Sequence, residues 1–147
     1  MPFGGHILEW SARLHEIGLD ISHYYFQKHG AYIVENADLP GFPRSEQAIL
    51  AFIIATHRGQ FDLQLPDKLP TAWQETALRI AIVHRLAVLL NRSRSTRDLP
   101  RIVLDVAGNS IRLGFPEEWL KANPLTVADL ERERKDLENI RFELFFA

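Results

Sequence analysis

The sequence has no cysteine, and this absence excludes several kinds of site. Without a thiol, the chain has no disulfide bond, thiolate zinc centre, iron–sulfur cluster or cysteine nucleophile. Neither sign of charge is in excess, because 17 Lys and Arg against 19 Asp and Glu leave a formal net charge of −2. There is therefore no global reason to expect nucleic acid as a partner, and an anion must be held by a local cluster of positive charge.

Long apolar runs and glycine-rich motifs are also missing. The most apolar stretch, residues 76–90, contains Arg79, His84 and Arg85 and is shorter than the roughly 20 residues of a membrane span. Charged residues such as Glu9 and Arg13 interrupt the first 20 residues, as they would not in a secretory signal. These features predict a cytoplasmic protein with no membrane partner. The eight glycines form no Gly-x-Gly-x-x-Gly, Gly-x-x-x-x-Gly-Lys or Gly-x-Ser-x-Gly motif, so no nucleotide cradle is recognisable.

What remains is the composition of a globular protein, with 46% hydrophobic and 24% charged residues. Ile7, Trp10, Leu14 and Ile17 share one helical face. Further periodic segments predict helices over residues 29–36, 45–57 and 71–91, then two strands around Gly108-Asn109, helices over 117–122 and 126–138, and a strand over 141–146. We therefore expect an α+β fold: a mainly helical domain, residues 1–98, and a small β-β-α-α-β domain with an antiparallel sheet, residues 99–147.

Polar residues mark the expected helix starts. Ser45 is expected to cap the third helix. Thr71 and Gln74 have the spacing of a capping box for the fourth, and Thr126 with Asp129 is expected to cap the last.

The segment Leu-His-Glu-Ile-Gly, residues 14–18, places a histidine beside a carboxylate on one helix. Metal phosphohydrolases of the HD class hold a divalent ion with such a pair, although their acid is aspartate. His15 and Glu16 are therefore candidate metal ligands, and the alternative is a solvated face with ordinary ion pairs. His23, His29 and His57 follow in the order in which extended HD sites place further ligands. They can equally be ordinary helix-end histidines or contacts to phosphate.

Arginines form the main local excess of positive charge. Residues 79–101 contain six, against Asp98 alone: Arg79, Arg85, Arg92, Arg94, Arg97 and Arg101. Guanidinium groups suit phosphate oxygens, which makes this segment a candidate anion site. Arg85 lies in the most apolar helix, so it needs either an internal carboxylate, for which Glu16 and Asp38 are candidates, or an anionic ligand.

Several segments together resemble one family. They are residues 14–18, Ile-Ser-His at 21–23, Lys-His-Gly-Ala-Tyr-Ile at 28–33, Asn-Ala-Asp-Leu-Pro-Gly-Phe at 36–42, Arg-Leu-Ala-Val-Leu-Leu-Asn at 85–91, and Leu-Gly-Phe-Pro at 113–116 followed by Trp119-Leu120. This pattern resembles the C-terminal part of the Ppx/GppA family of exopolyphosphatases and guanosine pentaphosphate phosphohydrolases. It covers nearly the whole chain.

The resemblance implies an HD-like helical domain followed by a small α/β domain. It also implies that the catalytic actin-like half of the family, with its glutamate, phosphate loops and Mg²⁺, is absent here, and that this chain begins inside the helical domain. No cofactor is expected in the chain itself. In the family the C-terminal half helps to bind long polyphosphate and joins two subunits.

We therefore expect a non-catalytic module that binds inorganic polyphosphate and forms a homodimer. The predicted phosphate contacts are Lys28, Arg58, Arg79, Arg85, Arg92 and Arg94. The predicted HD-like pocket comprises His15, Glu16, His23, His29 and His57, without a bound metal. The alternatives are an HD-type metal phosphohydrolase using His15 and Glu16, and a purely structural dimer scaffold.

Overall fold

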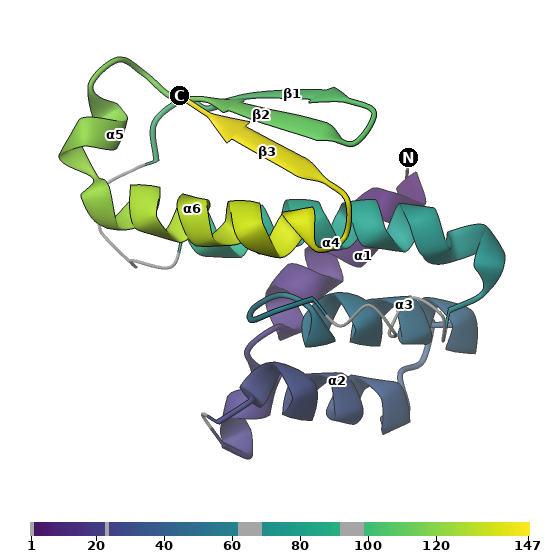
Figure 1. Cartoon of the computed structure of the whole chain (residues 1–147). Helices are drawn as coiled ribbons and strands as arrows, with labels where there is room; N and C mark the ends of the chain where they lie inside the picture. The colour runs from purple at the N-terminus through teal and green to yellow at the C-terminus, as the bar shows by residue number, and fades with distance from the viewer. Residues whose placement is uncertain (1, 23, 62–68, 92–98) are drawn as a thin grey trace. The chain divides into compact units, whose positions relative to one another are not determined.

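The computed structural model describes residues 2–22, 24–61, 69–91 and 99–147 (Figure 1). The chain divides into two compact units, Met1–Leu86 and Ala87–Ala147. The first is helical and the second combines helices with a sheet, which confirms the α+β class. The domain boundary expected after residue 98 falls outside the described residues and stays a prediction.

The first unit is built from helices. They are α1 (Pro2–Leu14), the 3-10 helix η1 (Ile17–Asp20), α2 (Phe26–Asn36), α3 (Arg44–Ala55) and the larger part of α4 (Thr71–Asn91). Helix α3 packs against α1 and α2, and η1 packs against α2. The core between them is apolar: Val34, Leu50, Ala51 and Ile54 are buried, and Trp10, Leu39 and Phe42 pack against them. The Asp-Leu-Pro-Gly-Phe-Pro segment, residues 38–43, is a loop between α2 and α3, and it contributes Leu39 and Phe42 to this core.

Two helix starts differ from the expectation. Ser45 does not cap α3, because the helix begins at Arg44 and the capping position is Pro43. Thr71 is the first residue of α4 rather than its cap, and the side-chain amide of Gln74 donates to the Leu69 carbonyl at 3.0 Å. Residue type alone did not decide these positions, because a proline just before each helix already restricts the backbone there.

Two glycines allow η1 to approach α2 closely. A Cβ at Gly18 would overlap the Phe26 carbonyl oxygen and lie 2.6 Å from the Gly30 nitrogen. A Cβ at Gly30 would lie 3.2 Å from the Ile54 side chain. The backbones therefore meet where any larger residue would push them apart.

The end of α2 is tied to α3 by a buried glutamine. The Gln47 amide nitrogen donates to the carbonyls of Val34 and Ala37, each at 2.7 Å, and lies 3.3 Å from that of Glu35. Carbonyls in the last turn of a helix have no partner inside the helix. Gln47 supplies that partner from the neighbouring helix, and so fixes where α2 ends.

The second unit contains β1 (Val103–Ala107), β2 (Ser110–Gly114), α5 (Trp119–Ala122), α6 (Pro124–Glu138) and β3 (Glu143–Phe146). The expected hairpin of β1 and β2 is confirmed, and Gly108 adopts a positive φ of 58° in its turn. Helix α6 begins at Pro124 after Asn123, so Thr126 lies inside the helix and does not cap it.

The sheet is mixed, whereas we expected it to be antiparallel. Strand β2 pairs with β1 antiparallel and with β3 parallel, in the order β1-β2-β3. Two helices connect β2 to β3, and such a crossover returns the chain in the same direction. Helix α6 packs against β3, and its Leu130 and Leu137 are buried, as are Ile111 and Leu144 on neighbouring strands (Figure 1).

Strand β1 lies at an edge of the sheet and differs from its neighbours in exposure. All five of its residues are exposed, including Val103, Leu104 and Val106 at 60%, 52% and 50%. Within the described ranges, no helix is both long and apolar enough to cross a membrane.

Replacing Gln47 by Leu tests the tie between α2 and α3. The variant leaves one buried and one partly buried carbonyl group without this donor, so we expect the free energy of unfolding to fall by about 2–4 kcal/mol. Gln74→Leu, which removes one partly buried bond of the same type, is the matched control and should cost less than about 1 kcal/mol. Urea unfolding followed by circular dichroism measures the free energy of unfolding of both variants. Equal losses in the two would contradict the role of Gln47 as the tie between α2 and α3.

Candidate functional site

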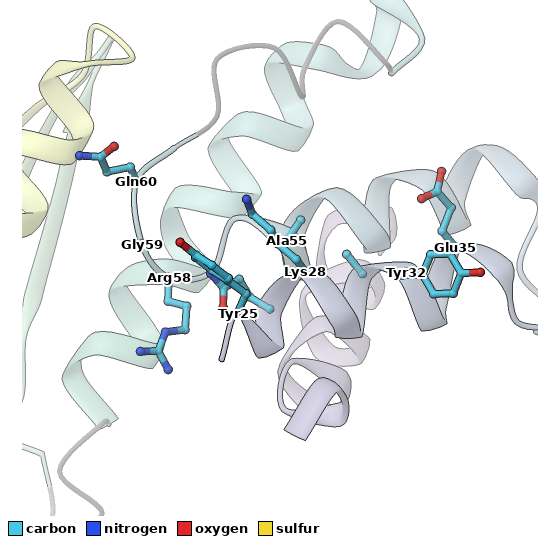
Figure 2. Close-up of a pocket in the computed structure, with 10 residues that line it drawn as sticks. Tyr25, Lys28, Tyr32, Glu35, Ala55, Arg58, Gly59 and Gln60 are labelled. Carbon is cyan, nitrogen blue, oxygen red and sulfur yellow. The ribbon is translucent and has the colours of Figure 1, made fainter. Parts of the chain in front are cut away.

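The first unit has a pocket of about 610 Å³ along α2 and the segment that follows α3 (Figure 2). Lys28, Tyr32 and Glu35 line it from α2, and Arg58, Gly59 and Gln60 line it from the other side. The α2 residues follow one another at intervals of four and three, so they share one helical face. This volume is typical of small-molecule sites.

Positive charge and aromatic rings gather at one end of the pocket. The Lys28 ammonium lies 5.1 Å from the centre of the Tyr25 ring, and the Arg58 guanidinium lies 4.7 Å from that of Phe26. Figure 2 shows the Lys28 and Arg58 side chains directed away from each other at the end of the pocket where Tyr25 lies. Two cations that are directed apart suit an extended anion better than a single small one.

Local backbone geometry presents these residues. Tyr25, which precedes α2, has a positive φ of 53°, and Gly59 has a φ of 75°. Left-handed backbone is costly for most residues but not for glycine, so Gly59 lets the chain turn directly after Arg58. The turn therefore brings Arg58 to the pocket.

Three histidines form a second, buried group in the same unit. The ring centres of His15 and His57 lie 5.1 Å apart, those of His15 and His84 5.5 Å, and those of His57 and His84 5.9 Å. His57 and His84 are each only 1% exposed. The structure therefore brings together two histidines of the predicted HD-like pocket and one that the sequence analysis did not include.

Hydrogen bonds orient two of the rings. His57 Nδ1 lies 2.6 Å from the Ile54 carbonyl and His15 Nδ1 lies 2.7 Å from the Ala12 carbonyl. A carbonyl can only accept, so both Nδ1 atoms carry the proton. In the described part of the chain, His57 Nε2 and the hydroxyl of Ser11 have no hydrogen-bond partner, whereas His84 interacts with the Ser11 backbone.

Burial favours the neutral form of His57 and His84. Loss of solvation lowers the pKa of His57 to about 3 and that of His84 to about 4, and the neighbouring His15 lowers both further. Residues 2–22, 24–61, 69–91 and 99–147 contain no group of three or more His, Asp or Glu that could hold a metal ion.

Of the other predicted residues of the HD-like pocket, Glu16 borders the histidine group, His29 lies elsewhere on α2 and His23 is not described. Glu16 is half exposed, with a carboxylate oxygen 3.8 Å from His15 Nε2. His29 lies half buried on α2, and no ring contact joins it to the three histidines. His23 falls outside the described residues.

Of the predicted phosphate contacts, the structure brings Lys28 and Arg58 to one pocket. Arg79 pairs with Glu75 at 3.3 Å on the surface of α4. Arg85 is 2% exposed, donates to the Thr56 carbonyl at 2.6 Å and lies 4.4 Å over the Phe61 ring. These two contacts are to a carbonyl and a ring, so whether a carboxylate or an anionic ligand balances the charge of Arg85 stays a prediction. Arg92 and Arg94 are not among the described residues.

Sequence reasoning missed His84, Tyr25 and Tyr32. A signal for His84 was available, because it follows the buried Ala77 and Ala81 at helical spacing on α4. No local pattern distinguished the two tyrosines from core aromatics, since their exposure depends on where α2 packs.

Comparison with known proteins shows the protein family to which the chain belongs. Residues 4–134 match the sequence model of domain III of the Ppx/GppA phosphatases. The chain therefore belongs to the Ppx/GppA phosphatase family and is similar to a C-terminal part of it, as its motifs predicted.

The most similar relatives include two proteins with the same name, "Guanosine-5'-triphosphate,3'-diphosphate pyrophosphatase". The protein from Vibrio parahaemolyticus is 36% identical over 143 residues, which are 97% of this chain and 28% of that protein. The protein from Aeromonas hydrophila is 32% identical over 137 residues, which are 90% of this chain and 28% of that protein. The chain thus spans about 28% of the length of these relatives.

The buried histidines predict how stability depends on pH. Above about pH 6.5 His57 and His84 are neutral in both the folded and the unfolded chain. Below it the unfolded chain binds protons that the folded chain does not bind until about pH 4 and 3, so stability falls as pH falls. Each histidine contributes a slope of up to ~1.4 kcal/mol per pH unit in this window.

We expect His84→Gln to remove one such contribution. Denaturant unfolding of the two proteins at pH 8, 6, 5 and 4 measures the slope, and the values at pH 8 account for any loss of packing. If the free energies of unfolding of the wild type and the variant changed in parallel between pH 6.5 and 4, the lowered pKa of His84 would be contradicted.

Proposed function

We propose that this chain is a non-catalytic, C-terminal module that binds a phosphate chain within a Ppx/GppA phosphohydrolase. The parent enzyme would release phosphate from inorganic polyphosphate or from guanosine pentaphosphate, and the name of the relatives favours the second substrate. The family membership supports the parent class, and the pocket on α2 supports the binding role.

The observation that carries the binding role is the position of Lys28 and Arg58 on one pocket. Both side chains are exposed, and among the described residues that line the pocket Lys28 and Arg58 are cations and Glu35 is the one acid. An ammonium group and a guanidinium group can each donate to phosphate oxygens. Since they are directed apart, a chain of several phosphates can reach both, whereas a single phosphate reaches one.

Arg85 has a different role in this proposal. Its guanidinium is enclosed by the Thr56 carbonyl and the Phe61 ring, so we assign it to the stability of the unit. Arg79, Arg92 and Arg94 stay predicted contacts to the same phosphate chain.

Binding of inorganic tripolyphosphate tests the proposal. Lys28→Gln and Arg58→Gln should each weaken binding about tenfold, the scale of a lost charge-assisted hydrogen bond. By analogy with nucleic acids, each should also reduce the slope of log affinity against log salt by slightly less than one. Isothermal titration calorimetry at several salt concentrations measures both quantities.

Matched controls separate a specific site from general charge. Lys121→Gln and Arg132→Gln remove exposed cations from α5 and α6, and they should leave the affinity unchanged. Equal weakening by all four substitutions would refute a site at Lys28 and Arg58.

Dimerisation is the second part of the proposal, and strand β1 supports it. The strand has apolar side chains exposed on both faces of the sheet and lies at its edge, where its backbone groups can pair with another strand. A second copy of the chain that pairs there would cover Leu104 and Val106.

A charge on β1 should prevent this association. We expect Leu104→Lys to shift the chain from dimer to monomer in light scattering at high micromolar concentration. Leu125→Lys is the control, because Leu125 is 83% exposed on α6 of the same unit, and this variant should remain dimeric. A monomeric wild type, or a Leu104→Lys dimer, would exclude β1 as the interface.

A further inference from the structure

The two residues that end α3 are buried directly beside the exposed residues of the pocket. Thr56, which follows the last residue of α3, and His57 are each only 1% exposed. Arg58, Gly59 and Gln60 come next in the chain, and all three are exposed and line the pocket (Figure 2). The chain therefore passes from the interior to the pocket within one residue.

Side chains supply hydrogen-bond donors to the last turn of α3. The Thr56 hydroxyl donates to the Phe52 carbonyl at 2.8 Å, and His57 Nδ1 donates to the Ile54 carbonyl at 2.6 Å. Bonds of this kind satisfy the carbonyls at the end of a helix and fix where the helix stops. The backbone that leads to Arg58 is thus held by its own two preceding side chains.

Helix α4 also holds these two residues. The Arg85 guanidinium donates to the Thr56 carbonyl at 2.6 Å, and the ring of His84 lies 5.9 Å from that of His57. Arg85 is 2% exposed, so water competes little for its bond to the carbonyl. The place at which Arg58 leaves the interior therefore depends on a residue of another helix.

A second set of contacts reaches the Arg58 side chain. The His57 ring lies 5.4 Å from the ring of Phe26, and the Arg58 guanidinium lies 4.7 Å from the centre of the same ring. Phe26 is the first residue of α2 and is 8% exposed. One buried aromatic ring thus contacts the buried histidine and supports the exposed cation.

We propose that Arg85 and Phe26 are positioning residues for Arg58 at the pocket on α2. Arg85 fixes the backbone from which Arg58 extends, and Phe26 fixes the direction of its guanidinium, while neither contacts the ligand. A group that is ordered before binding loses less conformational freedom when the ligand arrives, so its contact is stronger. The inference rests on the proposed function for the ligand, and it gives Arg85 a role in binding that goes beyond the stability of the unit.

Calorimetric titration of the 147-residue chain with inorganic tripolyphosphate tests this role. Arg85→Met removes the donor to the Thr56 carbonyl, and Phe26→Leu removes the ring beneath Arg58. We expect each to weaken binding about three- to tenfold, because Arg58 must then be ordered by the ligand. Neither should weaken binding further in a chain that already carries Arg58→Gln, and both should keep their full effect in the Lys28→Gln chain.

Two further variants keep the comparison specific. Ile7→Val, a change at a fully buried position of α1, controls for loss of stability and should leave the affinity unchanged. Thr56→Val removes the hydroxyl bond to the Phe52 carbonyl and replaces Arg85→Met if that variant does not fold. Its effect on affinity should likewise disappear in the Arg58→Gln chain.

Weakening by Arg85→Met that persists in the Arg58→Gln chain would overturn the inference, since Arg85 would then act on the ligand without Arg58. NMR order parameters of the backbone amides of residues 58–60 provide a measurement without ligand. They should fall in Arg85→Met and keep their wild-type values in Ile7→Val, and unchanged values in Arg85→Met would refute the positioning role even if tripolyphosphate binds. Conversely, a wild type that does not bind tripolyphosphate would refute the proposed function, while lowered order parameters in Arg85→Met would still support the positioning of Arg58.

Discussion

The side-chain amide of Gln47 is the contact on which the geometry of the helical unit depends. It is buried, and it donates to two carbonyls in the final turn of α2 and just beyond it, at 2.7 Å each. The carbonyls of a helix end that packs against another helix need donors, and Gln47 supplies them to one buried and one partly buried carbonyl. The length and direction of α2 are therefore set by a residue of α3. Every pocket residue that α2 contributes is placed by this constraint.

Helix α2 packs with one face and lines the pocket with another. Gly30 and Val34 point into the unit, where the missing side chain of Gly30 lets the backbone of Gly18 approach. Lys28 and Tyr32 lie on the outer face and line the pocket. Because the inner face is packed tightly, the outer residues are held on a rigid support, which is what selective binding requires.

The helical unit contains two clusters of polar residues that differ in their exposure to solvent. The cluster of His15, His57 and His84 lies in the interior, where burial lowers the pKa of His57 and His84 and keeps them neutral at pH 7. The pocket is open to solvent and carries the cationic Lys28 and Arg58. The pocket is therefore open to ligands from solvent, whereas His57 and His84 are enclosed.

The sequence by itself determined the order of helices and strands, the turn at Gly108 and the family, because periodicity, turn residues and motif strings are local properties. It also predicted that His15 and His57 belong to one pocket, and it identified Lys28 and Arg58 as candidate cations for an anion site. Only the tertiary structure decided that β3 runs parallel to β2, that His84 joins the two other histidines, and that Arg85 is enclosed while Lys28 is exposed. These outcomes depend on which distant segments pack together. Side-chain spacing along the chain specifies the face of an element but not the neighbour that covers it.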